Sequence, residues 1–247
     1  MRDILYNEDK VYVDQGVFFG KGAFETIAYY DKPVLLDYHI ERLKKALDVL
    51  NMDQLEEKKL REFIDDKLSL HNTSFKITVT DKNIIISTRP IPYTEDMYRD
   101  GFNLTVSEVR RNKTSRLTYI KSCCYYENIL QKQEAVKKGY NDLIFLNEED
   151  KITETSCANI FFVKDKKIYT PKVSEGLLEG VIRRWIMDNY EVIETSIDIE
   201  DISEYDEVFI TNSLMGIMKV SKINNTSYNN GEISSIIRKD YENTKIN

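Results

Sequence analysis

The segment 24-FETIAYYDKPVLLDYHIERLKKALDVL-50 carries the pattern that decides the fold class. Residues 24–30 are rich in aromatic and β-branched side chains, which is typical of a β-strand. After a turn, Asp37 is expected to cap a helix. The apolar residues of that helix recur at helical spacing with charged residues between them: Ile40, Leu43, Leu47 and Leu50. The segment therefore predicts a strand followed by an amphipathic helix.

Strands and helices continue on both sides of this segment. Residues 16–22 form a glycine-punctuated turn, and residues 81–83 suit a tight hairpin. Gly139 is expected to close a helix just after its C-cap. Further strands are expected at residues 11–13, 75–80, 84–88, 103–106, 142–146, 158–163 and 207–211, and further helices at 54–70, 127–138, from Val181 onward and at 233–241.

The order of these elements predicts the fold class. Strands and helices neither alternate strictly nor form an all-β chain, so we expect an α+β fold with mixed sheets. Residues 110–118 are polar and lack periodicity, which is typical of a linker. We therefore expect two domains, residues 1–109 and residues 119–247.

Composition excludes several classes of protein. The chain has 247 residues and no apolar stretch that approaches the length of a membrane span. Its net charge of −7 disfavours binding to nucleic-acid phosphate. Three cysteines (Cys123, Cys124 and Cys157) form no disulfide framework, and the two histidines add no metal-ligand spacing. Because the first residues lack a signal-peptide core, we expect a cytoplasmic protein.

Three features could carry chemistry, although each has an ordinary structural explanation when taken alone. Lys121 precedes a predicted helix, where a surface lysine is common. Glu154 lies before an apolar strand and reads equally well as a loop carboxylate. Gly180 stands at the predicted start of a helix, where glycine is a usual cap. Only the sequence around these residues distinguishes a chemical role from an ordinary structural one.

Six segments, taken together and in order, resemble the class IV pyridoxal-phosphate enzymes. That family includes branched-chain and D-amino-acid aminotransferases and 4-amino-4-deoxychorismate lyase. The segments are FGKGAFET (19–26), HIERL (39–43), IKSCCYYENILQKQEA (120–135), ITETSCANIFFV (152–163), YTPKVSEGLLEGVIRR (169–184) and DEVFITNSLMGI (206–217). The resemblance implies fold type IV, with a smaller N-terminal α/β domain, a larger C-terminal domain built on a mixed-sheet pseudo-barrel, and pyridoxal 5'-phosphate as the cofactor.

The resemblance also implies roles for individual residues. Lys121 matches the Schiff-base lysine, which holds the cofactor and acts as the catalytic base. Glu154 matches the carboxylate that faces the pyridine nitrogen and keeps it protonated. Arg42 matches the arginine that grips the phosphate. The other cofactor-binding positions are Tyr126, Asn159, Val181, Ile182, Asn212 and Ser213, and the substrate-binding positions are Phe19, Phe24 and Lys76.

Two enzymatic activities remain open, because Lys121 and Glu154 would serve both. A deoxychorismate lyase removes a ring proton and expels pyruvate, whereas an aminotransferase passes the amino group to a keto acid. FGKGAFET and residues 211–217 resemble the lyases more closely, which favours a lyase of folate biosynthesis acting on a small amino substrate. A third alternative is a family member that only binds the cofactor or a partner, and the retention of Lys121, Glu154 and Arg42 argues against it.

Two further expectations follow from the resemblance. Relatives are homodimers, so we expect a homodimer. The loop at residues 81–83 is shorter than in many members, where this region helps to bind the substrate carboxylate. Lys76 is our candidate for that role here.

Overall fold

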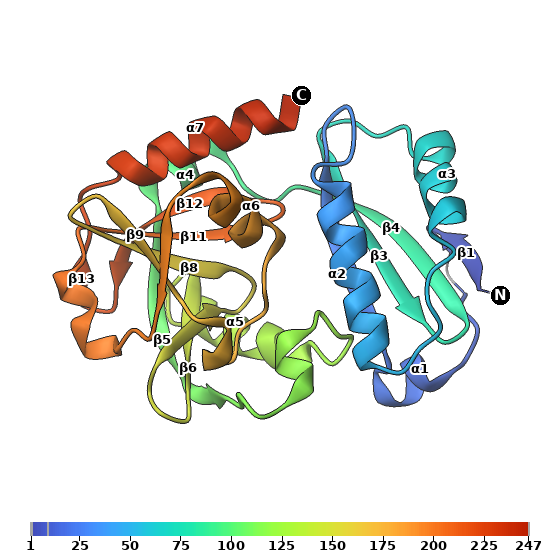
Figure 1. Ribbon diagram of the computed structural model, residues 1–247, viewed down its shortest axis with the longest axis horizontal. Helices are drawn as coiled ribbons and strands as arrows, with labels where there is room; N and C mark the ends of the chain where they lie inside the picture. Colours follow the sequence, from blue (N-terminus) through green and yellow to red (C-terminus); the bar gives the residue numbers. More distant parts are fainter. Residues whose placement is uncertain (1, 9, 247) are drawn as a thin grey trace. The chain divides into compact units, whose positions relative to one another are not determined.

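The strand-then-helix segment forms β2 (Gly22–Tyr29) and α2 (Leu36–Val49), as the sequence predicts. The computed structural model describes residues 2–8 and 10–246 (Figure 1). The chain divides into two compact units. Unit 1 holds the chain up to Pro92 and Ile120–Tyr125, and unit 2 holds Tyr93–Tyr119 and Tyr126–Lys245.

Unit 1 is built on a four-stranded sheet, sheet A. Its strand order is β1 (Asp3–Tyr6), β4 (Asn83–Pro90), β3 (Thr73–Thr80) and β2. Strands β2, β3 and β4 are antiparallel, and β1 pairs parallel with β4. Alternate residues such as Ala23, Ile27 and Phe75 pack with α2 and with α3 (Glu57–Lys67) in one apolar core. Because side chains alternate between the faces of a strand, Phe24 and Lys76 lie on the other face.

Two expectations for the N-terminal part are wrong. No strand forms at residues 11–13. The backbone of Tyr12 is hydrogen-bonded to the side chain of Asn83 instead of to another strand. The Tyr12 N–H donates to Asn83 Oδ1 at 2.8 Å, and Asn83 Nδ2 donates to the Tyr12 carbonyl oxygen at 2.9 Å. The glycine-punctuated turn contains a short helix, α1 (Gln15–Phe19), whose N-cap is Asp14.

Asp37 is not the cap of α2. The N-cap residue is Leu35, two residues earlier, which has a φ of 51°. Asp37 lies in the first turn, where its carboxylate pairs with Arg61 of α3 at 2.7 Å. A carboxylate there also interacts favourably with the helix dipole, which explains the residue type without a capping hydrogen bond.

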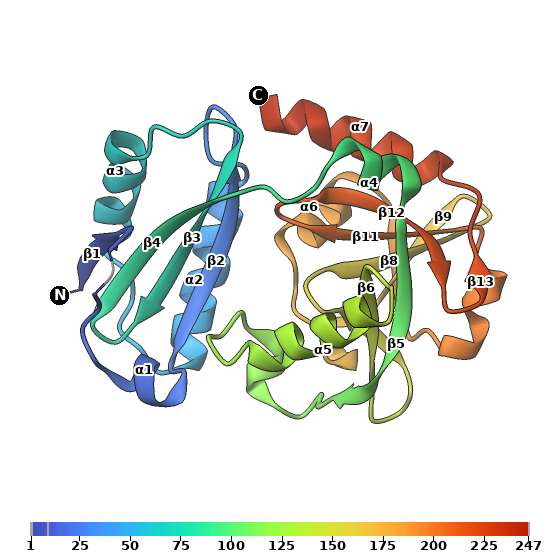
Figure 2. The same ribbon diagram turned by 180° about the vertical axis from the view of Figure 1, so that it is seen from behind.

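Unit 2 is built on a nine-stranded mixed sheet, sheet B, which curls into part of a barrel (Figure 2). The order along it is β10-β9-β8-β11-β12-β5-β6-β7, and β13 pairs with β12. Its strands are β5 (Phe102–Arg111), β6 (Asp142–Asn147), β7 (Ile152–Thr155), β8 (Asn159–Lys164), β9 (Lys167–Pro171), β10 (Val192–Thr195), β11 (Glu207–Asn212), β12 (Gly216–Ile223) and β13 (Thr226–Ser227). Its helices are α4 (Glu95–Asp100), α5 (Tyr126–Lys137), α6 (Val181–Asn189) and α7 (Glu232–Ile246).

The α+β fold class with mixed sheets is confirmed, and so are most of the expected elements. Gly139 follows α5 with a φ of 88°, a conformation that glycine adopts without strain. The confirmed strands lie at residues 75–80, 84–88, 103–106, 142–146, 158–163 and 207–211, and the expected helices correspond to α3, α5, α6 and α7.

The unit boundaries differ from the domain limits that the sequence suggests. The chain enters unit 2 at Tyr93, and residues 110–111, expected in the linker, belong to β5. The β5–β6 register shifts between Val106 and Arg110, so a bulge interrupts the alternation there. That irregularity explains why the end of β5 looks like a linker in the sequence.

Ile120–Tyr125 returns to unit 1, where Ser122 forms an isolated bridge with Ala23 of β2. In residues 2–8 and 10–246, none of the helices combines the length and apolar character needed to cross a bilayer.

Candidate active site

Lys121 lies on the short segment that extends sheet A of unit 1. The Phe24 N–H donates to the Lys121 carbonyl oxygen at 2.9 Å, and the Cys123 N–H donates to the Gly22 carbonyl oxygen at 2.8 Å. The Lys121 Nζ lies 4.6 Å from the ring centre of Phe24 and 4.9 Å from that of Tyr125. These two rings pack edge to face, with centroids 5.2 Å apart. The amine therefore lies in a corner formed by two aromatic rings.

A second lysine, Lys76, lies over the same Phe24 ring, with its Nζ 4.1 Å from the ring centre. Burial lowers the pKa of Lys76; Cys123 opposes this lowering and Arg89 adds to it. Unit 1 thus brings together three residues that the sequence analysis selected: Lys121, Phe24 and Lys76. It adds Tyr125, which the sequence analysis did not select.

Arg42 is held on α2 by a buried ion pair. Its Nε and Nη2 donate to Oε1 and Oε2 of Glu25 at 2.7 and 2.6 Å. His39, one turn earlier on α2, places its Nδ1 2.6 Å from Oε2 of the same carboxylate. Glu25 shares the helix-facing side of β2 with Ala23 and Ile27. Glu25 therefore fixes the orientation of the guanidinium through two of its five N–H donors.

Charge and burial set the protonation of this cluster. Burial raises the pKa of Glu25, but Arg42 and His39 together outweigh it and lower that pKa to about 2. Burial lowers the pKa of His39 from its ordinary value of 6.5; Glu25 opposes this lowering, and Arg42 and Lys121 add to it. His39 is therefore neutral near pH 7. Because a carboxylate only accepts hydrogen bonds, His39 Nδ1–H is the donor to Glu25.

Replacing Glu25 with glutamine is expected to lower the free energy of unfolding by about 3–5 kcal/mol, because it leaves the Arg42 guanidinium without its counter-charge. Urea titration of the protein without cofactor measures the change. Glu57→Gln is the matched control, since Glu57 pairs with Lys44 and Arg61 at the surface. Surface pairs contribute only about 0–1 kcal/mol. Equal effects of the two substitutions would contradict a buried clamp on Arg42.

Acid is expected to destabilise the protein in two steps. Below pH 6.5 the unfolded chain protonates His39 while the folded chain keeps it neutral, so the unfolded state binds more protons and stability falls as pH falls. The loss is at most about 1.4 kcal/mol per pH unit for this group. Glu25 acts in the same direction between pH 4.5 and about 2, because its pKa is depressed in the folded state.

Urea titrations between pH 7.5 and 5 measure the first step. The exposed His71 supplies the control, since a His71→Gln variant is expected to keep the same fall in stability. Constant or rising stability over this range would contradict a buried, neutral His39.

Glu154 lies in β7 of unit 2, with its carboxylate held on both oxygens. Its Oε1 lies 3.2 Å from Nη2 of Arg111, and its Oε2 accepts the Leu178 N–H at 3.2 Å. The side chain is only 10% exposed. This is a buried and oriented carboxylate, rather than the solvated loop residue of the alternative explanation.

Arg111 connects Glu154 to the turn between β7 and β8. Its Nη1 donates to Oδ1 of Asn128 on α5 at 3.1 Å, and Asn128 Nδ2 donates to the Ser156 carbonyl oxygen at 2.7 Å. The Arg111 guanidinium also stacks 3.9 Å from the ring centre of Phe145. The sequence does not point to Arg111, because the bulge in β5 interrupts the alternation that would place this residue in a strand.

Asn159 and Gly180 meet at the start of α6. Asn159 Nδ2 donates to the Leu178 carbonyl oxygen at 2.7 Å, so Leu178 contacts both Asn159 and Glu154. A Cβ at Gly180 would lie 1.9 Å from Oδ1 of Asn159, which only glycine avoids. Among the described residues, no side chain caps this helix. The N–H groups of its first turn, which includes Val181 and Ile182, are of the kind that binds anions.

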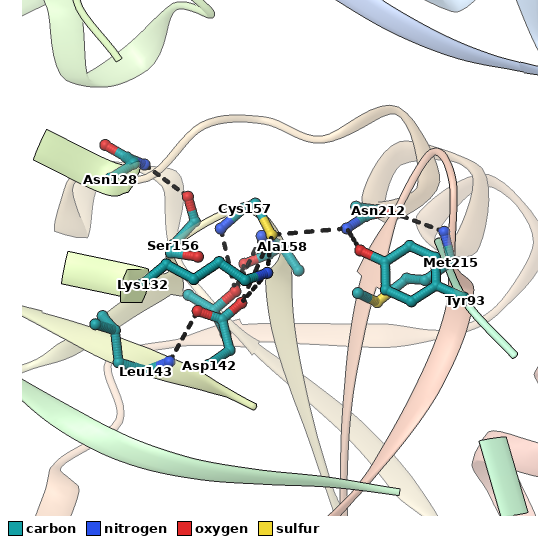
Figure 3. Close-up of polar contacts among 11 residues, drawn as sticks. Tyr93, Asn128, Lys132, Asp142, Leu143, Ser156, Cys157, Ala158, Asn212 and Met215 are labelled. Carbon is teal, nitrogen blue, oxygen red and sulfur yellow. Dashed lines mark hydrogen bonds and ion pairs between the residues drawn. The ribbon is translucent and has the colours of Figure 1, made fainter. Parts of the chain in front are cut away.

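The β11–β12 turn carries Asn212 and Ser213. Asn212 Oδ1 accepts the N–H groups of Leu214 and Met215, both at 2.9 Å, and so shapes the turn around Ser213. Asn212 Nδ2 donates to the Tyr93 hydroxyl at 3.2 Å (Figure 3). Two other selected residues are largely solvent-exposed: Tyr126, the first residue of α5, and Phe19, the last residue of α1. Their roles stay predictions.

Comparison with known proteins identifies the family. The model of the family "Amino-transferase class IV" matches residues 22–223. The aminodeoxychorismate lyase of Bacillus subtilis is 30% identical, over 93% of this chain and 87% of that protein. The D-alanine aminotransferase of Staphylococcus epidermidis is 27% identical, over 92% of this chain and 88% of that protein.

A solved structure agrees with these relatives. It is that of a candidate 4-amino-4-deoxychorismate lyase from Legionella pneumophila, which is 26% identical, has a TM-score of 0.84, and covers 98% of this chain and 99% of that chain. The fold is therefore fold type IV, as the sequence predicts. The chain belongs to the class IV aminotransferase family of pyridoxal-phosphate-dependent enzymes.

Proposed function

We propose that this protein is a lyase that converts 4-amino-4-deoxychorismate to 4-aminobenzoate and pyruvate, as a cytoplasmic enzyme of folate biosynthesis. The observation that carries the proposal is the 30% identity to the Bacillus subtilis aminodeoxychorismate lyase over nearly the whole chain. The lyase-like stretches at residues 19–26 and 211–217 support it.

Each unit, taken by itself, carries residues whose chemistry fits pyridoxal phosphate. The start of α6 offers the N–H groups of Val181 and Ile182 to the phosphate, and glycine at residue 180 leaves that helix end uncrowded. Arg42, oriented by Glu25, adds a guanidinium. The remaining ligands that we assign are Asn159, Asn212 and Ser213, and the hydroxyl of Tyr126 for the ring oxygen.

Two side chains carry the chemistry in this proposal. Bound pyridoxal phosphate supplies a protonated pyridine ring that withdraws electrons from the substrate carbon as a proton leaves. We assign to Lys121 the amine that holds the cofactor and then takes this proton, shielded by Phe24 and Tyr125. Glu154, oriented by Arg111, keeps the ring nitrogen protonated. In the lyase reaction the departure of pyruvate then leaves an aromatic ring.

Recognition of the substrate falls to Phe24, Lys76 and Phe19. The face of Phe24 suits a planar ring. Lys76 supplies a cation 4.1 Å from the same ring, within reach of a substrate carboxylate bound there. The loop at residues 81–83 is a tight connection between β3 and β4. It is therefore too short to contribute to binding of the substrate carboxylate.

An aminotransferase acting on D-amino acids or branched-chain amino acids is the second candidate. The 27% identity to the D-alanine aminotransferase of Staphylococcus epidermidis supports it. Both reactions need a base and a carboxylate at the ring nitrogen, so Lys121 and Glu154 do not distinguish them.

Product analysis distinguishes the two candidates. The purified holoprotein is supplied with 4-amino-4-deoxychorismate made in situ, and separately with panels of D- and L-amino acids plus a keto acid. We expect 4-aminobenzoate and pyruvate in equal amounts, and neither product with Lys121→Ala. Amino-group transfer to the keto acid without 4-aminobenzoate would replace the lyase proposal with the aminotransferase.

We also propose that the protein is a homodimer. Unit 1 exposes a run of large apolar side chains, the α1 patch, which consists of Val11, Tyr12, Val13, Val17, Phe18 and Phe19. Phe18 and Phe19 are 68% and 77% exposed. Clustered exposed apolar side chains mark interaction surfaces.

A charge in the α1 patch is expected to prevent dimerisation. The mass in solution, measured by light scattering after gel filtration, should be twice the 29.0 kDa of one chain for wild type and equal to it for Phe18→Asp. Val136→Asp is the control, because Val136 is an exposed apolar residue of α5 outside the patch. A monomeric wild type would contradict the homodimer.

A further inference from the structure

Three side chains of unit 2 form a cluster that the proposed reaction does not use (Figure 3). They are Cys157 in the β7–β8 turn, Lys132 on α5 and Asp142 at the start of β6. Lys132 Nζ lies 3.5 Å from Cys157 Sγ and 3.7 Å from Asp142 Oδ2. The Cys157 thiol donates to the same carboxylate oxygen at 3.6 Å. An amine, a thiol and a carboxylate therefore meet at contact distance.

Hydrogen bonds hold Asp142 and the turn that carries Cys157 in place. The Leu143 N–H donates to Asp142 Oδ1 at 2.8 Å, and the Asp142 side chain is fully buried. The turn that carries Cys157 is closed by Thr155, whose hydroxyl oxygen accepts the Ala158 N–H at 3.0 Å. Little motion is therefore needed to bring the amine and the sulfur into bonding distance.

The protonation state of the Cys157 thiol fits a pair, Cys157 and Lys132, whose side chains do not react with each other before the thiol is oxidised. Burial raises the pKa of the Cys157 thiol, Asp142 adds to this, and Lys132 opposes it. The thiol is thus protonated near neutral pH, which makes it slow to react on its own. The residue as a whole is only partly buried.

We propose that Cys157 and Lys132 form a reversible sulfur–nitrogen cross-link when hydrogen peroxide oxidises the thiol. In the first step Asp142 takes the thiol proton and the sulfur attacks a peroxide oxygen. The O–O bond breaks, the proton returns to the leaving hydroxide to form water, and Cys157 becomes a sulfenic acid. The sulfur is oxidised and the peroxide is reduced.

In the second step the Lys132 ammonium first gives a proton to Asp142, which frees the lone pair of the nitrogen. The nitrogen then bonds to the sulfur, the S–O bond breaks, and a second proton of the amine leaves with the hydroxyl group as water. The product is S–NH, with a neutral carboxylic acid beside it. The positive and the negative charge of the cluster therefore disappear together, so no buried charge loses its partner. Two equivalents of an added thiol reduce the S–N bond, restore both side chains and become a disulfide.

Peptide mapping tests the cross-link directly. The full-length protein is treated with an equimolar amount of hydrogen peroxide, digested without reductant and analysed by mass spectrometry. We expect a joined peptide pair that holds residues 132 and 157 and weighs two hydrogen atoms less than the sum of the reduced peptides. Dithiothreitol should separate the pair. The exposed Cys124, whose thiol contacts the carbonyl oxygens of Phe19 and Gly20, should instead carry added oxygen.

Lys132→Arg is the matched control, since it keeps a cation beside Asp142 but replaces the amine with a weakly nucleophilic guanidinium. We expect Cys157 in this variant to gain oxygen atoms without joining another peptide. The intact wild type should also gain several degrees in thermal midpoint on oxidation, because the cross-link closes the loop from residue 132 to residue 157.

Two results would overturn the proposal. One is a wild-type digest in which Cys157 carries only added oxygen or a disulfide. The other is a joined pair that retains an extra oxygen atom, which would contradict the sulfur–nitrogen bond. The wild-type digest alone decides between these outcomes if Lys132→Arg fails to fold.

Discussion

Lys121→Ala is expected to abolish turnover while the protein stays folded. The substitution removes both the amine that holds the cofactor and the base that moves the proton. General acid–base catalysis alone contributes about 10²–10⁴-fold, so the combined loss should exceed about 10⁴-fold. The measurement is product formation by protein saturated with pyridoxal phosphate, with circular dichroism as the check on folding.

Lys76→Ala is the control for this experiment. Lys76 lies over the same Phe24 ring as Lys121, so it tests whether any nearby amine suffices. We expect Lys76→Ala to keep the visible absorbance of the bound cofactor and to change KM more than kcat, since Lys76 is assigned to the substrate. Loss of the absorbance in Lys76→Ala, with retention in Lys121→Ala, would exchange the two roles.

Glu154→Gln is expected to retain the cofactor but to slow proton removal strongly. Glutamine keeps the size and a hydrogen bond but loses the charge that favours a protonated ring nitrogen. Removing one such electrostatic contribution from a buried site costs on the order of 10²–10³-fold in rate. Single-turnover kinetics at equal cofactor occupancy measure the effect.

Glu207→Gln is the matched control for that substitution. Glu207 is also buried in unit 2, but its carboxylate accepts the N–H groups of Ile233 and Ser234 at the start of α7. This variant should lose stability and keep the rate of the folded enzyme. If Glu154→Gln behaved in the same way, Glu154 would be a structural residue and not a partner of the ring nitrogen.

The local pattern of the sequence predicts the elements that carry their own signal. The hairpin of β3 and β4 and the helix α2 follow from alternation, helical spacing and a short loop. The strand β1 was missed, because its partner β4 lies far along the chain. The expected strand at residues 11–13 does not form, for a related reason. The backbone N–H and carbonyl oxygen of Tyr12 are hydrogen-bonded to the side chain of Asn83, which is distant in the sequence.

The candidate site also contains residues that the sequence indicates and residues that only the structure reveals. The resemblance selects Lys121, Glu154 and Arg42, but the residues that orient them follow only from tertiary contacts. One feature of the sequence does point to Glu25. It occupies a position between Ala23 and Ile27 that alternation assigns to the core, and a charge there calls for a partner. No such feature points to Arg111, because the bulge interrupts the alternation of buried and exposed residues along β5.

Identification of the lysine that carries the cofactor tests the assignment of Lys121 as the cofactor-binding amine. Sodium borohydride is added to the holoprotein, which fixes bound pyridoxal phosphate on the lysine that holds it, and the labelled peptide is sequenced by mass spectrometry. We expect the label on Lys121, and no label in Lys121→Ala treated in the same way. A label on Lys76, which lies against the same aromatic ring, would contradict it.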